Sequence, residues 1–380
     1  MKICFVATGD ITRLPMLKRA TGMATPLIKA GHQVAIVAMD CEGNRERFRL
    51  ECPDAIPLFF KSGSVWNEVR QKKKLIKSWN PDVVYVCFLG YRNWIHKFNV
   101  STKSVFVVEH SELNSSILQT GHKSIFRFAK HQYTYRIIEY LTIFLFDGLV
   151  CASRYLENEY KSMMKKIFRS KNIFYSPYAY NHEILNIESS LYEQLKEKYK
   201  GKTVFLFMGT FINLRFLTMI QAAEQLRENC NEFVLLFLGR KSKTNSENYK
   251  YIDEHGLNEV IQFTGYIPEH ELSSYFKLAD AFIAPLHDTI HDKARCPSKM
   301  FMYLPFKKPI LTCKVGEAYE LFGEDGYYFE PADPKSMKSL MKKIVENKGI
   351  THRVDTEQHT WDARANDFIN WIKQKYNIHK

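Results

Sequence analysis

Short apolar runs alternate along the chain with segments in which apolar residues recur every three or four positions. This alternation predicts β-strands joined by α-helices, and therefore parallel sheets with crossover helices. Several runs are apolar almost throughout, as in Val105–Val108, which is typical of strands buried on both faces. The strands predicted in the first half are Lys2–Ala7, Gln33–Ala38, Val83–Cys87, Ser104–Val108, Gly148–Cys151 and Asn172–Tyr175.

The same alternation begins again after Pro177, following which Asn186–Gly201 has the composition of a charged, helical linker. The chain is therefore predicted to be an α/β protein with two doubly wound domains, residues 1–180 and 181–358. A last helix, Trp361–Tyr376, has one apolar stripe. The strands predicted in the second half are Val204–Met208, Phe233–Leu238, Ile261–Phe263, Ala281–Ala284, Pro309–Thr312 and Gly326–Phe329.

The charge of the chain points to anionic partners. Its 54 lysines and arginines exceed its 41 aspartates and glutamates, which gives a formal charge of +13. Such a surface attracts nucleic acid, anionic lipid or phosphorylated small molecules. The sequence has no recognition-helix, zinc-finger or RNA-binding sheet motif, so we do not expect nucleic acid as a partner.

The eight cysteines form no CxxC pair and have no zinc-site spacing, which favours free thiols in a reducing cytoplasm. The first residues read as a strand rather than as a signal peptide. No apolar run approaches the ~20 residues of a membrane span. These features predict a soluble or peripheral cytoplasmic protein.

One segment in the second half has the pattern of a phosphate-binding turn. A buried strand ends at Gly209 and Thr210, and a helix is expected to begin near Phe216, with Arg215 at the junction. Glycine lets the backbone approach a ligand closely, and the start of a helix offers free N–H groups to phosphate. An ordinary strand-to-helix turn with a surface arginine has the same pattern, so both interpretations stay open.

A second turn, Arg295–Lys299, precedes the helix expected at Met300–Leu304. Pro297 favours a turn, Ser298 is the expected N-cap, and Lys299 falls in the first turn of the helix. A lysine there opposes the helix dipole, at a cost of roughly a few tenths of a kcal/mol unless an anion compensates. Two cations at this point favour the binding of a diphosphate, whereas they do not stabilise the helix. The alternative is a solvated basic turn.

Three further turns offer weaker candidates. Gly316–Glu320 follows a strand, and its carboxylates are suited to accept hydrogen bonds from sugar or ribose hydroxyls, although exposed glutamates near helix starts are common. Glu109 and His110 end a buried strand, where a histidine can act in hydrogen bonding or proton transfer but is more often structural. Gly9-Asp10 follows the first strand without a GxGxxG pattern, which argues against a dinucleotide site.

Two basic segments, residues 122–146 and 161–171, intersperse lysines and arginines with aromatic and aliphatic residues. An amphipathic basic helix of this kind can lie on an anionic membrane surface. The aromatic residues are equally suited to a protein core, so the sequence leaves both interpretations open.

Taken together, these segments resemble the family-4 glycosyltransferases of the GT-B fold, over nearly the whole chain and most strongly in its second half. The similar segments are Ala30–Val34, Phe207–Arg215, Phe263–Pro268, Tyr275–Pro285, Lys307–Leu311 (the usual Gly-Lys-Pro-Val-Ile), Phe329–Pro334 and Thr360-Trp361. The resemblance implies two Rossmann-like domains facing across a cleft, with residues 359–380 crossing back to the first. It implies a retaining, metal-independent transferase without cofactor.

The same resemblance implies that the second domain holds a nucleoside-diphosphate sugar. The first domain would hold a saccharide or lipid-linked saccharide acceptor in surface polysaccharide synthesis, on the inner face of the membrane where the acceptor is lipid-linked. By position, Arg215 and Lys299 would stabilise the leaving diphosphate, and His110 would lie near the transferred sugar. The other donor-binding candidates are Gly209, Thr210, Arg295, Ser298, Gly316, Glu317 and Glu320, and those on the acceptor side are Gly9, Asp10 and Glu109.

The chain departs from this family at one important point. The family carries two glutamates with seven residues between them, and the corresponding positions here are Ala294 and Met302. Neither side chain can accept a hydrogen bond as a carboxylate does. Glu317 and Glu320 are the residues available to replace these contacts. The alternatives are a weak or inactive member that acts as a partner subunit, and a GT-B sugar-nucleotide epimerase.

Overall fold

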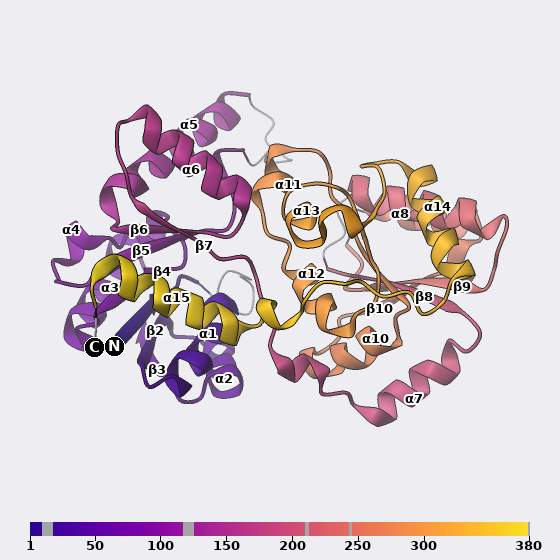
Figure 1. Ribbon diagram of the computed structural model, residues 1–380, viewed down its shortest axis with the longest axis horizontal. Helices are drawn as coiled ribbons and strands as arrows, with labels where there is room; N and C mark the ends of the chain where they lie inside the picture. The colour runs from indigo at the N-terminus through magenta and orange to yellow at the C-terminus, as the bar shows by residue number, and fades with distance from the viewer. Residues whose placement is uncertain (10–17, 117–124, 210–212, 243–244, 379–380) are drawn as a thin grey trace. The chain divides into compact units, whose positions relative to one another are not determined.

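The computed structural model describes residues 1–9, 18–116, 125–209, 213–242 and 245–378, which divide into two compact units (Figure 1). The first unit comprises residues 1–179, 293–296 and 357–380, and the second comprises residues 180–292 and 297–356. Each unit is one parallel sheet covered by helices, so the predicted α/β class with two Rossmann-like folds is confirmed. The C-terminal helix groups with the first unit, as the resemblance implied.

The first unit contains a seven-stranded sheet of order β3-β2-β1-β4-β5-β6-β7, in which every pair of neighbours is parallel. The strand order reverses between β1 and β4, and ligands of such sheets bind beyond the carboxyl ends of the strands at this point. The strands are β1 (Lys2–Val6), β2 (Gln33–Met39), β3 (Ile56–Phe60), β4 (Val83–Val86), β5 (Val105–His110), β6 (Gly148–Cys151) and β7 (Asn172–Tyr175).

Helices cover both faces of this sheet, as the apolar runs predicted. Ile3 and Phe5 of β1 belong to an apolar cluster that includes residues of α1 and α15. Cys4 and Val6 point the other way, into a cluster with residues of α3, α5 and α6. The helices are α1 (Lys18–Lys29), α2 (Glu42–Glu51), α3 (Val65–Trp79), α4 (Lys97–Val100), α5 (Ile125–Leu145), α6 (Arg154–Lys166) and α15 (Trp361–Tyr376).

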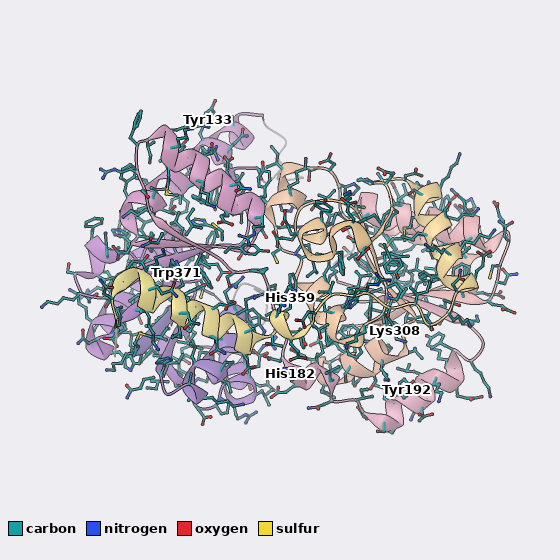
Figure 2. All side chains as sticks on the ribbon, viewed as in Figure 1. Tyr133, His182, Tyr192, Lys308, His359 and Trp371 are labelled. Atoms are coloured by element: carbon teal, nitrogen blue, oxygen red, sulfur yellow. The ribbon has the colours of Figure 1, made fainter. Side chains whose placement is uncertain are left out.

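The C-terminal helix α15 packs closely against α1. A Cβ atom added to Gly22 would lie 2.6 Å from the indole of Trp361, so the two helices can approach this closely only because α1 has glycine at that point. Further along α15, Trp371 (labelled in Figure 2) stacks on Phe174 of β7, with ring centroids 5.2 Å apart. The Thr360 hydroxyl caps the first turn by accepting a hydrogen bond from the Ala363 N–H.

The second unit has a six-stranded parallel sheet of order β10-β9-β8-β11-β12-β13, which reverses between β8 and β11. Its strands are β8 (Thr203–Met208), β9 (Phe233–Leu238), β10 (Ile261–Gly265), β11 (Ala281–Ala284), β12 (Ile310–Thr312) and β13 (Tyr327–Tyr328). Its helices are α7 (Ser189–Lys198), α8 (Asn213–Arg227), α9 (Ser246–Glu254), α10 (Leu272–Leu278), α12 (Ser298–Tyr303), α13 (Glu317–Phe322) and α14 (Pro334–Glu346). The short helix α11 (Ile290–Ala294) begins in this unit and ends in the first.

Most predicted strands agree with the structure to within two residues, but β3 was missed. Its sequence contains Pro57, and its first two residues are exposed. A proline argues against a central strand because it cannot donate a backbone hydrogen bond. The structure tolerates it because β3 is an edge strand of the sheet. All eight cysteines are free, as predicted. Within the described ranges, no helix is long and apolar enough to cross a membrane.

Candidate active site

Predicted donor residues of the second unit lie close after the carboxyl ends of its strands. Strands β8, β11 and β12 are neighbours and parallel, so their carboxyl ends share one edge of the sheet. Gly209 directly follows β8, and Gly316 lies in the turn after β12. Helix α12, which carries Lys299, lies between β11 and β12 in the sequence. This edge is where open α/β sheets bind their ligands.

The structure brings Lys299 and Gly209 together. The Nζ of Lys299 lies 4.0 Å from the centroid of the ring of Phe207, which belongs to β8 and precedes Gly209 by two residues. A Cβ atom built on Gly209 would lie 3.0 Å from the same Nζ. The φ angle of Gly209 is +130°, which side-chain-bearing residues rarely adopt. The backbone therefore favours glycine here, and the ammonium group lies close to the place that a side chain would occupy.

Helix α12 is held in place by Tyr303, four residues after Lys299. The Tyr303 hydroxyl accepts a hydrogen bond from the Met208 N–H, with 2.9 Å between the nitrogen and the oxygen. Its ring stacks on Phe282 of β11, with centroids 4.1 Å apart and planes 7° apart. Both contacts are fully desolvated because Tyr303 is buried, and burial raises the pKa of its hydroxyl above the ordinary range. Lys299 thus rests on a rigid support.

The predicted N-cap of α12 is wrong. The helix begins at Ser298, and the capping position is taken by Pro297, which makes no side-chain capping hydrogen bond. Proline has φ fixed near the extended region, here −70°, and this suits the residue before the first helical position. Ser298 is therefore the first helical residue, and its role in donor binding stays a prediction.

Arg215, in the first turn of α8, forms an ion pair with Asp292 of α11. Its Nη2 donates to both carboxylate oxygens of Asp292, at 2.6 and 2.5 Å. Asp292 is fully buried and also accepts a hydrogen bond from the His287 N–H at 2.7 Å. The pair fixes the guanidinium at the base of α8. Asp292 could not be predicted from the sequence, since it lies 77 positions from Arg215 and no motif links the two residues.

The glutamates of the third turn lie on α13 with different exposures. Gly316 precedes the helix with φ +52°, Glu317 is buried and Glu320 is exposed to solvent. Of the two carboxylates, Glu320 is therefore the one that a ligand in solution can reach directly. Their contact with donor hydroxyls stays a prediction.

Residues 293–296, which include Arg295, group with the first unit rather than with the second. The carbonyl of Ala294 accepts a hydrogen bond from the Ser153 hydroxyl at 2.6 Å, and the Tyr178 N–H donates to the Cys296 sulfur at 3.1 Å. Ala294 is fully buried in the apolar cluster that contains Cys4 and Val6. A glutamate at this position would place a carboxylate in that cluster, which is unfavourable without a partner. The loss of the first motif glutamate is thus matched by the local packing.

In the first unit, His110 ends β5 and is nearly fully buried. Its Nδ1 is 2.9 Å from the Tyr160 hydroxyl, and the two rings are 4.4 Å apart. Its Nε2 has no hydrogen-bond partner among the described residues. Burial lowers the pKa of the His110 imidazole from 6.5 to about 3, so the ring is neutral near pH 7. A neutral imidazole with one unsatisfied nitrogen is suited to hydrogen-bond a ligand hydroxyl.

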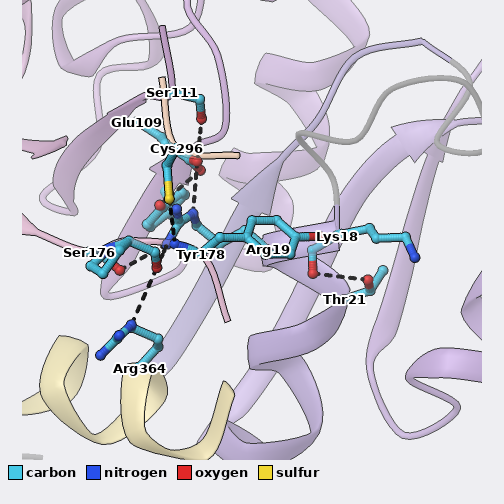
Figure 3. Close-up of polar contacts among 11 residues, drawn as sticks. Lys18, Arg19, Thr21, Glu109, Ser111, Ser176, Tyr178, Cys296 and Arg364 are labelled. Atoms are coloured by element: carbon cyan, nitrogen blue, oxygen red, sulfur yellow. Dashed lines mark hydrogen bonds and ion pairs between the residues drawn. The ribbon is translucent and has the colours of Figure 1, made fainter. Parts of the chain in front are cut away.

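Glu109 lies beside His110 in the sequence but points into a buried network (Figure 3). One carboxylate oxygen accepts from Arg19 Nε at 2.8 Å and from the Ser111 hydroxyl at 2.7 Å, and the other accepts from the Tyr85 hydroxyl at 2.9 Å. Burial alone would lower the pKa of the Arg19 guanidinium, but the Glu109 carboxylate outweighs burial and raises it. These contacts hold the Glu109 carboxylate in the core of the unit. Its acceptor-side role stays a prediction.

Arg19 extends the network to the C-terminal helix. It donates to the Ser176 hydroxyl at 2.8 Å and to the Pro177 carbonyl, which also accepts from Arg364 of α15 (Figure 3). Neither arginine was singled out from the sequence, because the contacts that join them to this network span 90 to 187 residues. Gly9, the remaining acceptor-side candidate, follows β1 with φ +70°. Asp10 and Thr210 lie outside the described residues.

Residues 191–361 match the family model described as "Glycosyl transferases group 1". A glycosyltransferase from Rickettsia africae matches with TM-score 0.67 and 16% identity, over 99% of this chain and 97% of its own. Anabaena HepE in complex with UDP and glucose matches with TM-score 0.65 and 13% identity, over 99% and 95%. The chain has the GT-B fold of glycosyltransferases.

The GT-B fold is also shared by proteins with a different activity. A Listeria monocytogenes protein named as a UDP-N-acetylglucosamine 2-epimerase matches with TM-score 0.62 and 12% identity, over 100% of this chain and 97% of its own. At such identities the structural likeness gives the fold alone. The family model matches residues 191–361, which lie mostly in the second unit, and supports a glycosyltransferase. A search of curated proteins finds no match.

Proposed function

We propose that the chain is a retaining glycosyltransferase that moves a sugar from a nucleoside diphosphate to a saccharide or lipid-linked saccharide acceptor. The observation that carries this proposal is the position of Lys299 beside Gly209. A helix-borne ammonium group lies against a glycine turn at the carboxyl edge of the second sheet. An open backbone turn with a cation beside it is suited to a phosphate group. The family match over residues 191–361 supports the same role.

In the proposed reaction, the bond between the anomeric carbon and the diphosphate oxygen breaks. The acceptor hydroxyl oxygen then bonds to that carbon, and its proton passes to the oxygen of the leaving diphosphate. Negative charge grows on the leaving diphosphate, and we assign its stabilisation to Lys299 and Arg215, with Arg295 assisting. Fixed charges aimed at developing charge contribute through electrostatic preorganisation, typically about 3–4 kcal/mol for each group. Asp292 and Tyr303 hold Arg215 and Lys299 respectively, so both cations are preorganised.

We assign His110 a hydrogen bond to the transferred sugar through Nε2. The ring is neutral, because burial lowers its pKa to about 3, so we propose that it orients a hydroxyl rather than acting as a general base at neutral pH. Glu317 and Glu320 are proposed to bind donor hydroxyls. No metal or cofactor is part of the proposal, because basic side chains take the diphosphate charge.

Release of nucleoside diphosphate tests the proposal. The protein is incubated with a panel of sugar nucleotides and with membrane extract as the source of acceptor. Acceptor-dependent release from one donor, accompanied by transfer of the labelled sugar, supports a transferase. A lipid-linked acceptor, recovered as a labelled lipid, would place the reaction at the inner face of the membrane.

Two rival functions have observations behind them. The structural likeness to a protein named as an epimerase motivates sugar-nucleotide interconversion, which would appear as a changed or hydrolysed donor without any acceptor. The absence of both motif glutamates, at Ala294 and Met302, motivates an inactive partner subunit. That function predicts donor binding without turnover for every acceptor supplied.

A further inference from the structure

The outer face of α5 carries a stripe of apolar side chains that remain partly exposed. Tyr133, Ile137, Leu141 and Phe144 recur at helical spacing and are 71%, 60%, 37% and 40% exposed. Other apolar residues of the same helix, such as Ile138 and Ile143, lie in the core of the unit. The helix is therefore apolar on two faces, of which the packing of the unit uses one. Figure 2 shows Tyr133 on α5, away from the sheet of this unit.

Phe168, just after α6, is the most exposed large apolar residue in the described part of the chain, at 96%. Its φ angle is +51°, in the left-handed region that bulky residues seldom adopt. The Arg169 N–H bonds back to the Met164 carbonyl and the Phe168 N–H to the Lys165 carbonyl, as in a helix C-terminus that usually has glycine at this position. Glycine would adopt this backbone conformation with less strain. The exposed Phe168 ring is therefore not explained by the stability of this unit.

Beside Phe168, residues from the end of α6 to the start of β7 line a hollow of about 460 Å³ that is open to solvent. Its lining includes four cations, Lys161, Lys165, Arg169 and Lys171, and one carboxylate, Glu157, which gives a net charge of +3. Glu157 is already paired with Arg154 and Lys161. Burial, together with the nearby cations Lys97 and Arg169, lowers the pKa of the Lys171 ammonium. The hollow is therefore a site of positive potential suited to phosphate groups.

The apolar stripe and the cationic hollow are adjacent. The Arg169 guanidinium, which lines the hollow, lies 5.4 Å from the ring centroid of Phe144 at the end of the stripe. Arg136 of α5 also pairs with Glu159 of α6, which ties the two helices together. Residues 122–124 lie outside the described residues. In the basic segment 161–171, Met163 and Met164 are buried in the core, whereas Phe168 is exposed.

We infer that the α5–α6 surface, which consists of Tyr133, Ile137, Leu141, Phe144, Phe168 and the four cations of the hollow, docks on an anionic phospholipid bilayer. The lipid phosphates bind in the hollow, while Phe168 and the α5 stripe enter the interface between head groups and acyl chains. Charge complementarity selects this occupant: apolar residues bordered by cations match a surface that is anionic outside and apolar beneath. The surface belongs to the first unit alone and does not depend on the proposed transfer reaction.

Co-sedimentation of the full chain with vesicles tests this inference. Binding is compared between vesicles of phosphatidylcholine alone and vesicles with 30% phosphatidylglycerol (roughly the anionic content needed for the charge effect), at low and high salt. We expect binding only to the anionic vesicles, with a loss at high salt because screening weakens attraction to the charged surface. Equal binding to both vesicles, or none to either, would overturn the inference.

Two variants and one control identify the surface. Phe168→Gly should weaken vesicle binding severalfold while leaving thermal stability equal or higher, because glycine suits the backbone at this point. Lys165→Glu/Arg169→Glu should weaken binding by roughly tenfold or more, since each cation near an anionic surface contributes appreciably. Lys335→Glu/Lys343→Glu, on α14 of the second unit, changes the net charge by the same amount and should bind as the wild type does.

The control separates a defined surface from the overall charge of +13. Equal loss of binding in both charge-reversal variants would show that net charge alone is responsible and would overturn the inference. So would wild-type binding by Phe168→Gly. Vesicle binding could also be abolished by an added protein or nucleic acid that binds only residues outside this surface. That result would also contradict the inference. Acceptor-dependent release of nucleoside diphosphate is measured in parallel, so failure of the transferase proposal is distinguishable from failure of this one.

Discussion

The Nη2 of Arg215 donates to both carboxylate oxygens of Asp292, and this aspartate is fully buried 77 residues further along the chain. The pair joins the first turn of α8 to α11, so it sets the direction of the one guanidinium that the proposed reaction uses in the second unit. Without its partner, Arg215 would keep its charge but lose its fixed orientation.

Asp292→Asn is therefore expected to lower the rate of nucleotide release by tenfold or more, because the asparagine keeps the shape and removes the charge that orients Arg215. Breaking a buried ion pair on one side typically costs about 3–5 kcal/mol, and the slight exposure of Arg215 favours the lower end. Kinetics and thermal unfolding check both effects. Asp325→Asn, at an exposed position of the same unit, is the control and should change neither. Unchanged turnover in Asp292→Asn would contradict the proposal that Asp292 positions Arg215 for the reaction.

Gly209→Ala should reduce donor binding. The added Cβ would lie 3.0 Å from the Lys299 ammonium and would also strain a backbone with φ +130°. Gly201→Ala is the matched control, because Gly201 also has positive φ, at +80°, but nothing lies within 4 Å of its added Cβ. We expect titration with nucleoside diphosphate to show a loss of affinity for the first variant alone. Equal affinities of the two variants for nucleoside diphosphate would show that Gly209 is not part of the donor-binding site.

Stability should depend on pH through His110. Its pKa is 6.5 in the unfolded chain and about 3 in the fold, so below pH 6.5 the unfolded chain binds a proton that the folded chain does not. The stabilisation from the neutral ring is complete above about pH 6.5 and falls by about 1.4 kcal/mol for each pH unit below it. Between pH 6.5 and 5 the wild type should lose about 2 kcal/mol more than His110→Gln. Denaturant unfolding at both pH values measures the difference.

If His110→Gln and the wild type lost equal free energy of unfolding on acidification, the neutral buried imidazole would be contradicted.

Gly22→Ala should destabilise the first unit. Alanine would gain up to about 1 kcal/mol of helix propensity, but its Cβ would lie 2.6 Å from the Trp361 indole, which is buried and cannot move aside. Overpacking of this kind costs about 1–3 kcal/mol, so the clash should outweigh the propensity. Thermal unfolding measures the loss, and adding Trp361→Phe to the variant should restore part of it. A Gly22→Ala protein more stable than the wild type would show that α15 yields easily.

The local pattern of the sequence was enough to predict the fold. Nearly continuous apolar runs such as Val105–Val108 are strands buried on both faces, and Trp361–Tyr376 is the C-terminal helix with the predicted bounds. The edge strand β3 was missed because Pro57 and partial exposure give it a pattern unlike that of the central strands. Propensity and periodicity report local structure, and edge positions depend on neighbours far away in the chain.

The candidate site was predictable only where a residue type and a turn coincide. Lys299 and Gly209 were singled out separately, and the structure places them in contact. Asp292 and Arg19 could not be found, because each acts through an ion pair with a residue 77 or 90 positions away. The N-cap of α12 was assigned to Ser298 since serine is a better capping residue than proline, but the fixed φ of Pro297 decides the geometry.

Turnover by Lys299→Ala bears most directly on the proposed function. The measurement is release of nucleoside diphosphate from the productive donor in the presence of acceptor, with Lys335→Ala, an exposed lysine of α14, as the control. Removal of the charge that stabilises the leaving diphosphate should lower kcat by roughly 10²–10³-fold, with the fold and the control unaffected. Full activity in Lys299→Ala would contradict the proposal that the site at the carboxyl edge of the second sheet carries the reaction.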